Sequence, residues 1–351
     1  MNEQGKKIEL SVLDVSPVPS GSTASDALRN TLDLARFADE LGYKRYWLAE
    51  HHNTDLLACP SPAIMIGHVA ALTKNIRVGS GGVMLPNHAP LKVVENFKVL
   101  EALYPGRLDL GIGRAPGTDR VTALALRRAR ELIAADDFPQ QMEELLGFFN
   151  DEFPPENPFR RVHAIPKGVG MPDIWLLGSS DFSARMAAEM GLGFAFAHHI
   201  SPAPALAAMQ DYHASFKPSR YLNEPRAILA VSVICAETDE EAECLARSVD
   251  LVWLRFARGD HSKPFPSVEE AESYPYNDLD LEVIERNRDR ILVGSPGLIR
   301  KNLERFSELT LANEIMVMTM VHDHSLRRRS YELLAKEFEI SNTKGEAHYA
   351  K

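Results

Sequence analysis

Cysteine is scarce in this chain of 351 residues, which contains only Cys59, Cys235 and Cys244. Three cysteines so far apart form neither a disulfide framework nor a paired C-x-x-C metal site. Residues 1–7 are polar and lack the apolar core of a signal peptide. We therefore expect reduced thiols and a cytoplasmic location.

Basic residues are also in deficit, because 39 Lys and Arg face 49 Asp and Glu, which gives a formal net charge of −10. Without a basic surplus the chain is poorly suited to nucleic acid or to an anionic membrane surface, and we expect neither partner. No apolar run reaches the roughly 18 residues of a membrane-spanning helix. With 45% hydrophobic and 25% charged residues, the composition is that of an ordinary globular protein.

Short apolar runs alternate with helical patterns along the chain. The runs predict strands at residues 8–15, 46–49, 76–83, 107–112, 173–177, 193–197, 226–235 and 314–320. A doubly wound sheet rarely has so many consecutive units, whereas a closed barrel needs them. We therefore predict an α/β fold, a (β/α)₈ TIM barrel, with residues 1–351 as a single domain.

Two long stretches interrupt this alternation. One covers a helical region at 120–149, softly broken at 136–139, and a proline-rich loop at 151–172. The other, at 258–289, is charged and contains three prolines. Segments of this kind predict insertions after strands four and seven.

Polar and glycine-rich groups lie within the third predicted strand and at the ends of several others. They are Glu50-His51-His52, Ser80-Gly81-Gly82, Gly111-Ile112-Gly113-Arg114, Gly178-Ser179-Ser180-Asp181 and His198-His199. Barrel active sites lie where the carboxyl ends of the strands meet the following loops. We therefore expect these groups to share one rim of the barrel.

A phosphate site is predicted where Gly178-Ser179-Ser180 precedes a helix. The N–H groups at a helix start and two hydroxyls can face one anion, and Arg114 on the neighbouring strand end adds bidentate donors. The alternative is that Ser180 or Asp181 is only a helix N-cap. Gly81 and Gly82 indicate either a bulge approached closely by a ligand or a tight barrel corner.

Four histidines, His51, His52, His198 and His199, bring a metal site into consideration. Adjacent side chains on an extended chain point in opposite directions, so each pair offers at most one inward ligand. No acidic residue fits the usual metallohydrolase layout, and we expect no metal.

Four motifs lie in order along the chain, namely G-Y-K-R-Y-W-L-A-E-H-H-N at 42–53, R-V-G-S-G-G-V-M-L-P at 77–86, P-G-R-L-D-L-G-I-G-R at 105–114 and W-L-L-G-S-S at 175–180. Together they resemble the bacterial luciferase-like family of flavin-dependent monooxygenases, which are (β/α)₈ barrels. The F-A-H-H at 196–199 is most similar to an uncharacterised bacterial branch of that family.

The resemblance implies FMN as the cofactor. It implies that His51 is the active-site histidine, with Glu50 and His52 as structural neighbours. Gly81 and Gly82 match a pair joined by a non-prolyl cis peptide under the flavin ring. The implied cofactor-binding residues are Gly81, Gly82, Arg114, Gly178, Ser179, Ser180 and His198. Gly113 stands where the luciferase catalytic subunit has a reactive cysteine, so light emission is not expected.

The expected reaction is that of a two-component monooxygenase. Reduced FMN comes from a separate NAD(P)H:flavin reductase, and with O₂ it oxygenates a small organic substrate. No G-x-G-x-x-G follows a strand, so no nicotinamide domain is expected. A deazaflavin-dependent hydride-transfer enzyme, a non-catalytic flavin-binding subunit and a metal hydrolase are the alternatives. Relatives pair through early helices, so we expect a homodimer formed by residues 60–73 and 91–103.

Overall fold

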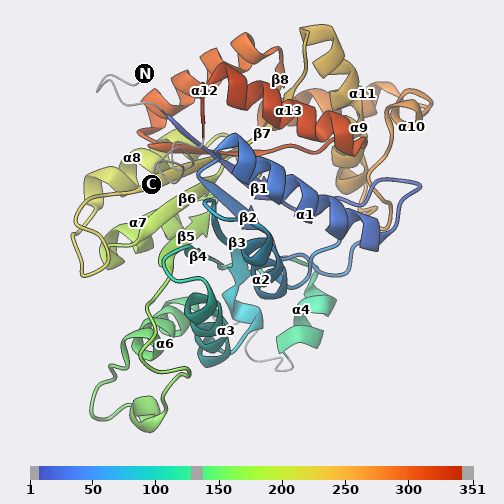
Figure 1. Ribbon diagram of the computed structural model, residues 1–351. Helices are drawn as coiled ribbons and strands as arrows, with labels where there is room; N and C mark the ends of the chain where they lie inside the picture. Colours follow the sequence, from blue (N-terminus) through green and yellow to red (C-terminus); the bar gives the residue numbers. More distant parts are fainter. Residues whose placement is uncertain (1–7, 128–136, 342–351) are drawn as a thin grey trace, which may run out of the picture.

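Eight parallel strands close into a barrel in this computed structural model, which describes residues 8–127 and 137–341 (Figure 1). They are β1 (Glu9–Asp14), β2 (Arg45–Leu48), β3 (Arg77–Met84), β4 (Leu108–Gly113), β5 (Asp173–Gly178), β6 (Gly193–Ala197), β7 (Ala227–Cys235) and β9 (Glu314–Met318). Each strand pairs with the next one, and β9 pairs with both β7 and β1. The predicted (β/α)₈ barrel is therefore confirmed.

Helices cover the outside of the barrel (Figure 1). They include α1 (Ala24–Leu41), α2 (Pro62–Leu72), α3 (Pro90–Leu103), α7 (Asp181–Met190), α8 (Ala205–Ser215), α12 (Pro296–Thr310) and α13 (His324–Glu337). Local chemistry sets their ends, as in α1, where Thr23 and Asp26 form a capping box and Gly42 terminates the helix at a φ of 90°. Helix residues such as Ile66 and Phe97 join outward-facing strand residues in the largest core cluster.

The two long segments expected from the sequence contain additional elements. Between β4 and β5 lie α4 (Arg120–Arg127), α6 (Phe138–Asn150) and the 3₁₀ turn η2 (Pro158–Arg161). The middle of the helical region expected at 120–149 falls on residues 128–136, outside the described residues. Between β7 and α12 lie α9 (Asp239–Ala257), α10 (Val268–Glu272), α11 (Asp278–Asn287) and the 3₁₀ turn η3 (Arg288–Arg290).

A ninth strand, β8 (Ile291–Gly294), was not expected from the sequence. It pairs with the second half of β7, from Ser232 to Cys235, while the first half of β7 pairs with β9. β7 is long enough to serve both partners, so β8 lies beside the closed barrel. Its four residues follow the charged run of η3, and two of them are only half-buried, which explains why no apolar pattern indicated a strand.

Charged residues fill the barrel interior near the amino ends of the strands. The guanidinium of Arg45 is buried and donates to Asp109 at 2.9 Å and to Glu314 at 2.7 Å. The indole of Trp47 and the guanidinium of Arg77 also donate to Asp109. Buried charges are tolerated only when they are paired in this way. An apolar cluster that includes Trp47 and Trp175 lies beside these charges, and the guanidinium of Arg45 stacks on Trp175 at 4.9 Å.

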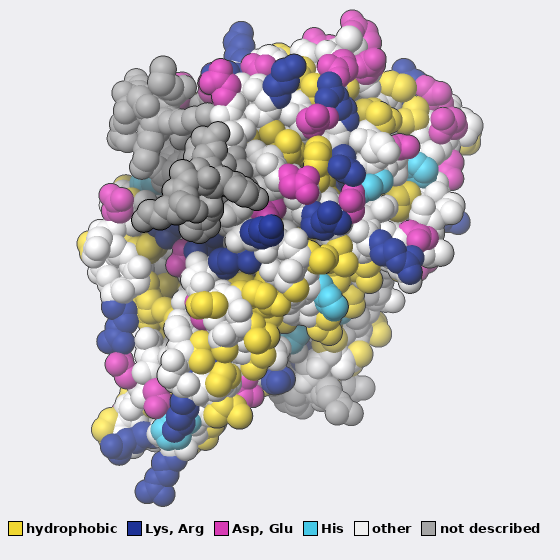
Figure 2. All heavy atoms as spheres, viewed as in Figure 1, with side chains coloured by type: hydrophobic (Ala, Val, Ile, Leu, Met, Phe, Trp, Pro, Cys, Tyr) yellow, Lys and Arg dark blue, Asp and Glu magenta, His cyan; other side chains and the backbone are white. Residues whose placement is uncertain are grey.

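The surface is mixed in charge, except where hydrophobic side chains gather over α2 and α3 (Figure 2). None of the helices in the described part of the chain is long and apolar enough to cross a membrane.

Candidate active site

A cavity of about 200 Å³ lies at the carboxyl ends of the barrel strands. Of the expected site residues, those that line it are Gly81, Arg114, Gly178, Ser179 and Ser180. Three others, Gly82, His51 and His198, are not among its described lining residues. Apolar side chains from several strands complete the wall. The structure thus brings the ends of β3, β4 and β5 together around one cavity, as the rim expectation requires.

His51 lies in the loop after β2, beside the cavity. Its backbone N–H donates to the carbonyl of Cys59 at 3.1 Å, and its Nδ1 is buried without a hydrogen-bond partner among the described residues. Burial lowers the pKa of His51 to about 4, although the carboxylate of Glu50 acts in the opposite direction. The ring is close enough to His199 for the two to interact electrostatically. A neutral imidazole with an unused nitrogen is therefore available at this position.

Glu50 is buried and connects the loop after β2 to the 3₁₀ turn η1 (Leu85–Asn87). Its carboxylate accepts from the backbone N–H of Met84 at 3.0 Å and lies 2.9 Å from His52 Nε2 and 3.0 Å from His88 Nε2. Burial alone would raise the pKa of Glu50, but the hydrogen bonds from His88, His52 and Met84 lower it. Through these contacts, Glu50 and His52 tie the loop after β2 to its neighbouring segments. The sequence did not indicate His88, because it lies 38 residues further along the chain.

Gly81 and Gly82 lie where the β3–β4 ladder changes register, and the peptide bond between them is cis. A Cβ on Gly81 would come within 2.7 Å of Leu13 Cδ1, and one on Gly82 would collide with Leu177. Both alternatives weighed from the sequence contribute, because the strand bulges here and its neighbours leave no room for a side chain. The backbone of Gly81 is thereby exposed to the cavity.

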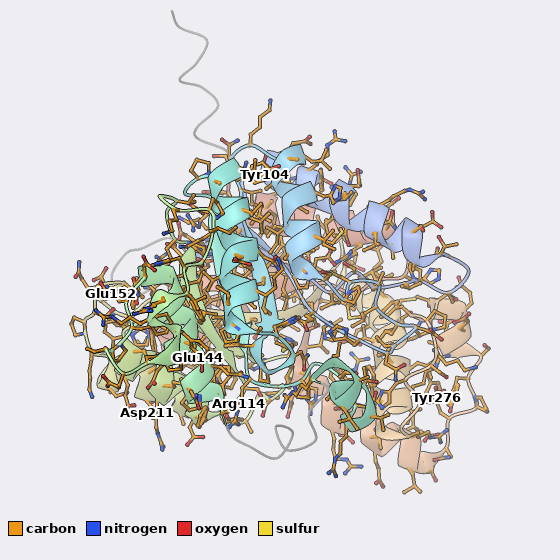
Figure 3. All side chains as sticks on the ribbon, turned by 90° about the horizontal axis from the view of Figure 1, so that it is seen from below. Tyr104, Arg114, Glu144, Glu152, Asp211 and Tyr276 are labelled. Atoms are coloured by element: carbon orange, nitrogen blue, oxygen red, sulfur yellow. The ribbon has the colours of Figure 1, made fainter. Side chains whose placement is uncertain are left out.

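The donors expected for a phosphate group converge between β4 and α7. Ser180 occupies the N-cap position of α7, yet its side chain makes no capping hydrogen bond. The N–H groups of the first turn are therefore not capped by that side chain. Arg114 stacks on the ring of Phe182 at 4.1 Å and lies on the same side of the molecule as Glu144 of α6 (Figure 3). The carboxylate of Asp181, which would oppose an anion, pairs with Arg185 at 3.1 Å. This donor set fits a phosphate.

The two histidines that follow β6 point to different environments. His198 is 7% exposed, and its ring packs against Phe306 of α12 at 4.9 Å, outside the barrel. His199 lines the cavity, and its Nδ1 lies 3.1 Å from the carbonyl oxygen of Ala230. The sequence predicted that His198 binds the cofactor, but its ring is turned toward α12. The neighbouring His199 lines the cavity. Residues 198–200 form a turn after β6, and this turn directs the two rings to different sides.

The opposite mouth of the barrel holds a larger hollow, of about 710 Å³. It lies between the amino ends of the strands, and its described lining includes the carboxylates of Glu9, Glu224, Glu308 and Glu314. Acidic walls disfavour an anionic cofactor, and barrel enzymes place their chemistry at the carboxyl ends. Within the described residues, no group of histidine, cysteine and acidic side chains is arranged to hold a metal ion.

The closed barrel, with a cavity at the carboxyl ends of its strands, places the protein in the class of α/β-barrel proteins. The chain belongs to the luciferase-like monooxygenase family, whose model matches residues 8–313.

The similarity to several relatives extends over nearly the whole chain. The chain is 48% identical to the uncharacterized protein YvbT of Bacillus subtilis, over 95% of this chain and 98% of that protein. It is 36% identical to the N-acetyl-S-alkylcysteine monooxygenase of Bacillus subtilis, over 93% of this chain and 97% of the relative. The crystal structure of apo-MsnO8 is similar with a TM-score of 0.86 and 40% identity, over 95% of this chain and 98% of that one.

Proposed function

We propose that this protein is the oxygenating component of a two-component, FMN-dependent monooxygenase. Reduced FMN would come from a separate NAD(P)H:flavin reductase, and the substrates would be O₂ and a small organic molecule. When bound, reduced FMN supplies the electrons that activate O₂, so that one oxygen atom enters the substrate and the other leaves as water.

One observation carries the proposal. The cavity combines phosphate donors at one side, from Arg114, Ser179 and Ser180, with a side-chain-free backbone at Gly81. A flat ring joined to a phosphate by a short chain needs these two features in one pocket. Membership of a monooxygenase family, and a 36% identical relative named as a monooxygenase, support oxygenation over hydride transfer.

The residues of the chain have separate tasks in this proposal. Arg114 and the first turn of α7 hold the phosphate. Gly178 leaves room for Ser183, which belongs to that turn, and Gly81 with Gly82 supports the ring face. The apolar wall, which includes Trp47, keeps water away from the reacting atoms. His51 accepts or returns a proton at its unpaired nitrogen, because burial keeps the imidazole neutral.

Binding is the first test. Purified protein is titrated with oxidised FMN in air, with reduced FMN under anaerobic conditions, and with a deazaflavin in parallel. We expect reduced FMN to bind most tightly. Tight binding of the deazaflavin without binding of either form of FMN would show that the proposal is wrong and would favour a hydride-transfer enzyme.

Oxygen transfer is the second test. With a flavin reductase, NADH and ¹⁸O₂, the protein is incubated with a panel of small apolar alcohols, ketones, amides and thioethers, and products are examined by mass spectrometry. We expect ¹⁸O incorporation, reduced about 10²- to 10⁴-fold in His51→Ala. The exposed His163, which lies next to Asp151, provides the matched control His163→Ala. Equal rates of ¹⁸O incorporation in the two variants would show that His51 takes no part in the proposed proton transfer.

A further inference from the structure

The cavity has two chemically different halves. In the closed barrel, β2 to β5 are neighbours on one side, and β6, β7, β9 and β1 are neighbours on the other. The donors proposed for FMN all come from the first half. The second half is lined by apolar residues, namely Leu13, Ala195, Ala197, Ile200, Ala230 and Met316. Among the described residues that line this second half, His199 alone has a strong hydrogen-bonding group in its side chain.

The hydrogen bond of His199 fixes which of its nitrogens carries the proton. Nδ1 lies 3.1 Å from the carbonyl oxygen of Ala230, and the backbone N–H of His199 donates to the same oxygen at 3.4 Å. A carbonyl oxygen only accepts, so Nδ1 must donate. In a neutral imidazole the other nitrogen, Nε2, is then an acceptor. His199 therefore offers the cavity a lone pair and no N–H.

The surroundings keep this ring neutral and in place. Burial lowers the pKa of His199 to about 4, and electrostatic interactions with His198, His51 and Arg290 act in the same direction, against the hydrogen bond to Ala230. The guanidinium of Arg290 donates to the carbonyl oxygen of Ile200 and stacks on Trp253 at 4.9 Å. The turn that follows β6 is thereby tied to the segment between β7 and β9.

We propose that the second half of the cavity binds the organic substrate, and that His199 selects an uncharged, mainly apolar molecule with one N–H or O–H donor for Nε2. This inference rests on the proposed function, because it reserves the first half for FMN. A buried acceptor without a donor costs free energy, so the site discriminates against molecules that cannot donate. A carboxylate would meet a lone pair and an apolar wall, and it would bind poorly.

Two isomeric probes test this selection. 1-Hexanol and 1-methoxypentane contain the same atoms, but only the alcohol has an O–H. Their dissociation constants are measured by calorimetry with protein free of flavin and again with bound FMN. We expect the alcohol to bind about tenfold more tightly in both cases, as one buried hydrogen bond would give. The preference should disappear in His199→Phe and should persist in the control His198→Phe, because His198 packs against Phe306.

NMR of the His199 imidazole tests the proposal in the wild-type protein, so this test does not depend on the folding of a variant. ¹⁵N NMR of the flavin-free protein should show His199 with its proton on Nδ1, and 1-hexanol should shift the Nε2 signal while 1-methoxypentane should not. A proton on Nε2, equal affinity for the two isomers, or no binding of either isomer would overturn the proposal. If the preference is present but FMN does not bind, the proposed function is wrong and the acceptor role of His199 stands by itself.

Discussion

The imidazoles of His51 and His199 are kept neutral by burial, which lowers the pKa of each from 6.5 to about 4. Two neutral rings near one cavity provide acceptors without adding positive charge beside the proposed flavin. Their side chains nevertheless differ in how they are held. Nδ1 of His199 is bound to Ala230, whereas Nδ1 of His51 has no partner among the described residues. The freer ring suits proton transfer, and the fixed ring suits recognition.

Stability should fall as the pH drops from about 6.5 to about 4. In this window the unfolded chain binds protons at both histidines and the folded chain does not, so folding becomes less favourable; above pH 6.5 both states are neutral and the contribution is flat. We expect roughly 1–3 kcal/mol from each ring. Urea unfolding from pH 4 to pH 7 measures it. His51→Gln and His199→Gln should each flatten the curve; variant curves parallel to that of the wild type would refute the expectation.

Arg114 should distinguish ligands that differ only in the phosphate. Arg114→Gln removes a guanidinium from the cavity wall, and we expect it to weaken FMN binding by roughly 10- to 100-fold. Binding of riboflavin, which has no phosphate, should hardly change. Fluorescence titration of both ligands provides the comparison. Arg220→Gln is the control, because Arg220 is exposed, pairs with Glu152 and does not line the cavity. An equal loss for both ligands would place Arg114 at the ring instead.

At the level of elements, the loop after β2 is positioned by residues far from it in sequence. Glu50 joins this loop to Met84, at the end of β3, and to His88, just before α3. Asn53 of the same loop donates to Asp119, which caps the start of α4. The loop that carries His51 is therefore fixed by the segments after β3 and β4.

Glu50→Gln should destabilise the fold more than a surface substitution does. The change removes the charge from a buried carboxylate that accepts several hydrogen bonds, and we expect a loss of about 2–4 kcal/mol in the free energy of unfolding. Urea unfolding at pH 7 measures it. The matched control is Glu189→Gln on the exposed side of α7. If the two variants were equally stable, the carboxylate of Glu50 would not hold these segments together.

At the scale of the whole molecule, α2 and α3 lie side by side and expose large hydrophobic side chains (Figure 2). Ile64 and Leu103 are each 64% exposed, and Val99 and Leu72 are about half exposed. A contiguous apolar patch of this kind is typical of an interaction surface. These helices are the ones expected to pair two copies of the chain.

Pairing should depend on this patch. We expect wild-type protein to sediment as a dimer and the double variant Ile64→Glu, Leu103→Glu to sediment as a monomer, because a carboxylate cannot be buried in an apolar interface without a partner. The control Leu279→Glu, Leu281→Glu changes two exposed leucines on α11. A monomeric wild type, or a dimeric α2–α3 double variant, would reject this surface as the interface.

The sequence by itself determined the barrel and most of the cavity rim. The period and the length of an apolar run are local properties of the sequence. Eight consecutive strand–helix units can bury their apolar faces in only a few arrangements, and the closed barrel is one of them. Glycines and polar residues at strand ends therefore located Gly81, Arg114 and Ser179 on one cavity.

Only the tertiary structure decided which side chains meet. It chose His199 over His198 for the cavity wall, because the turn after β6 directs His199 toward Ala230 and His198 toward Phe306 of α12. It brought His88 to Glu50, joined Arg45 to Asp109 and Glu314, and added β8 beside β7. These contacts join residues far apart in the chain, and no local pattern encodes them, because each depends on barrel closure.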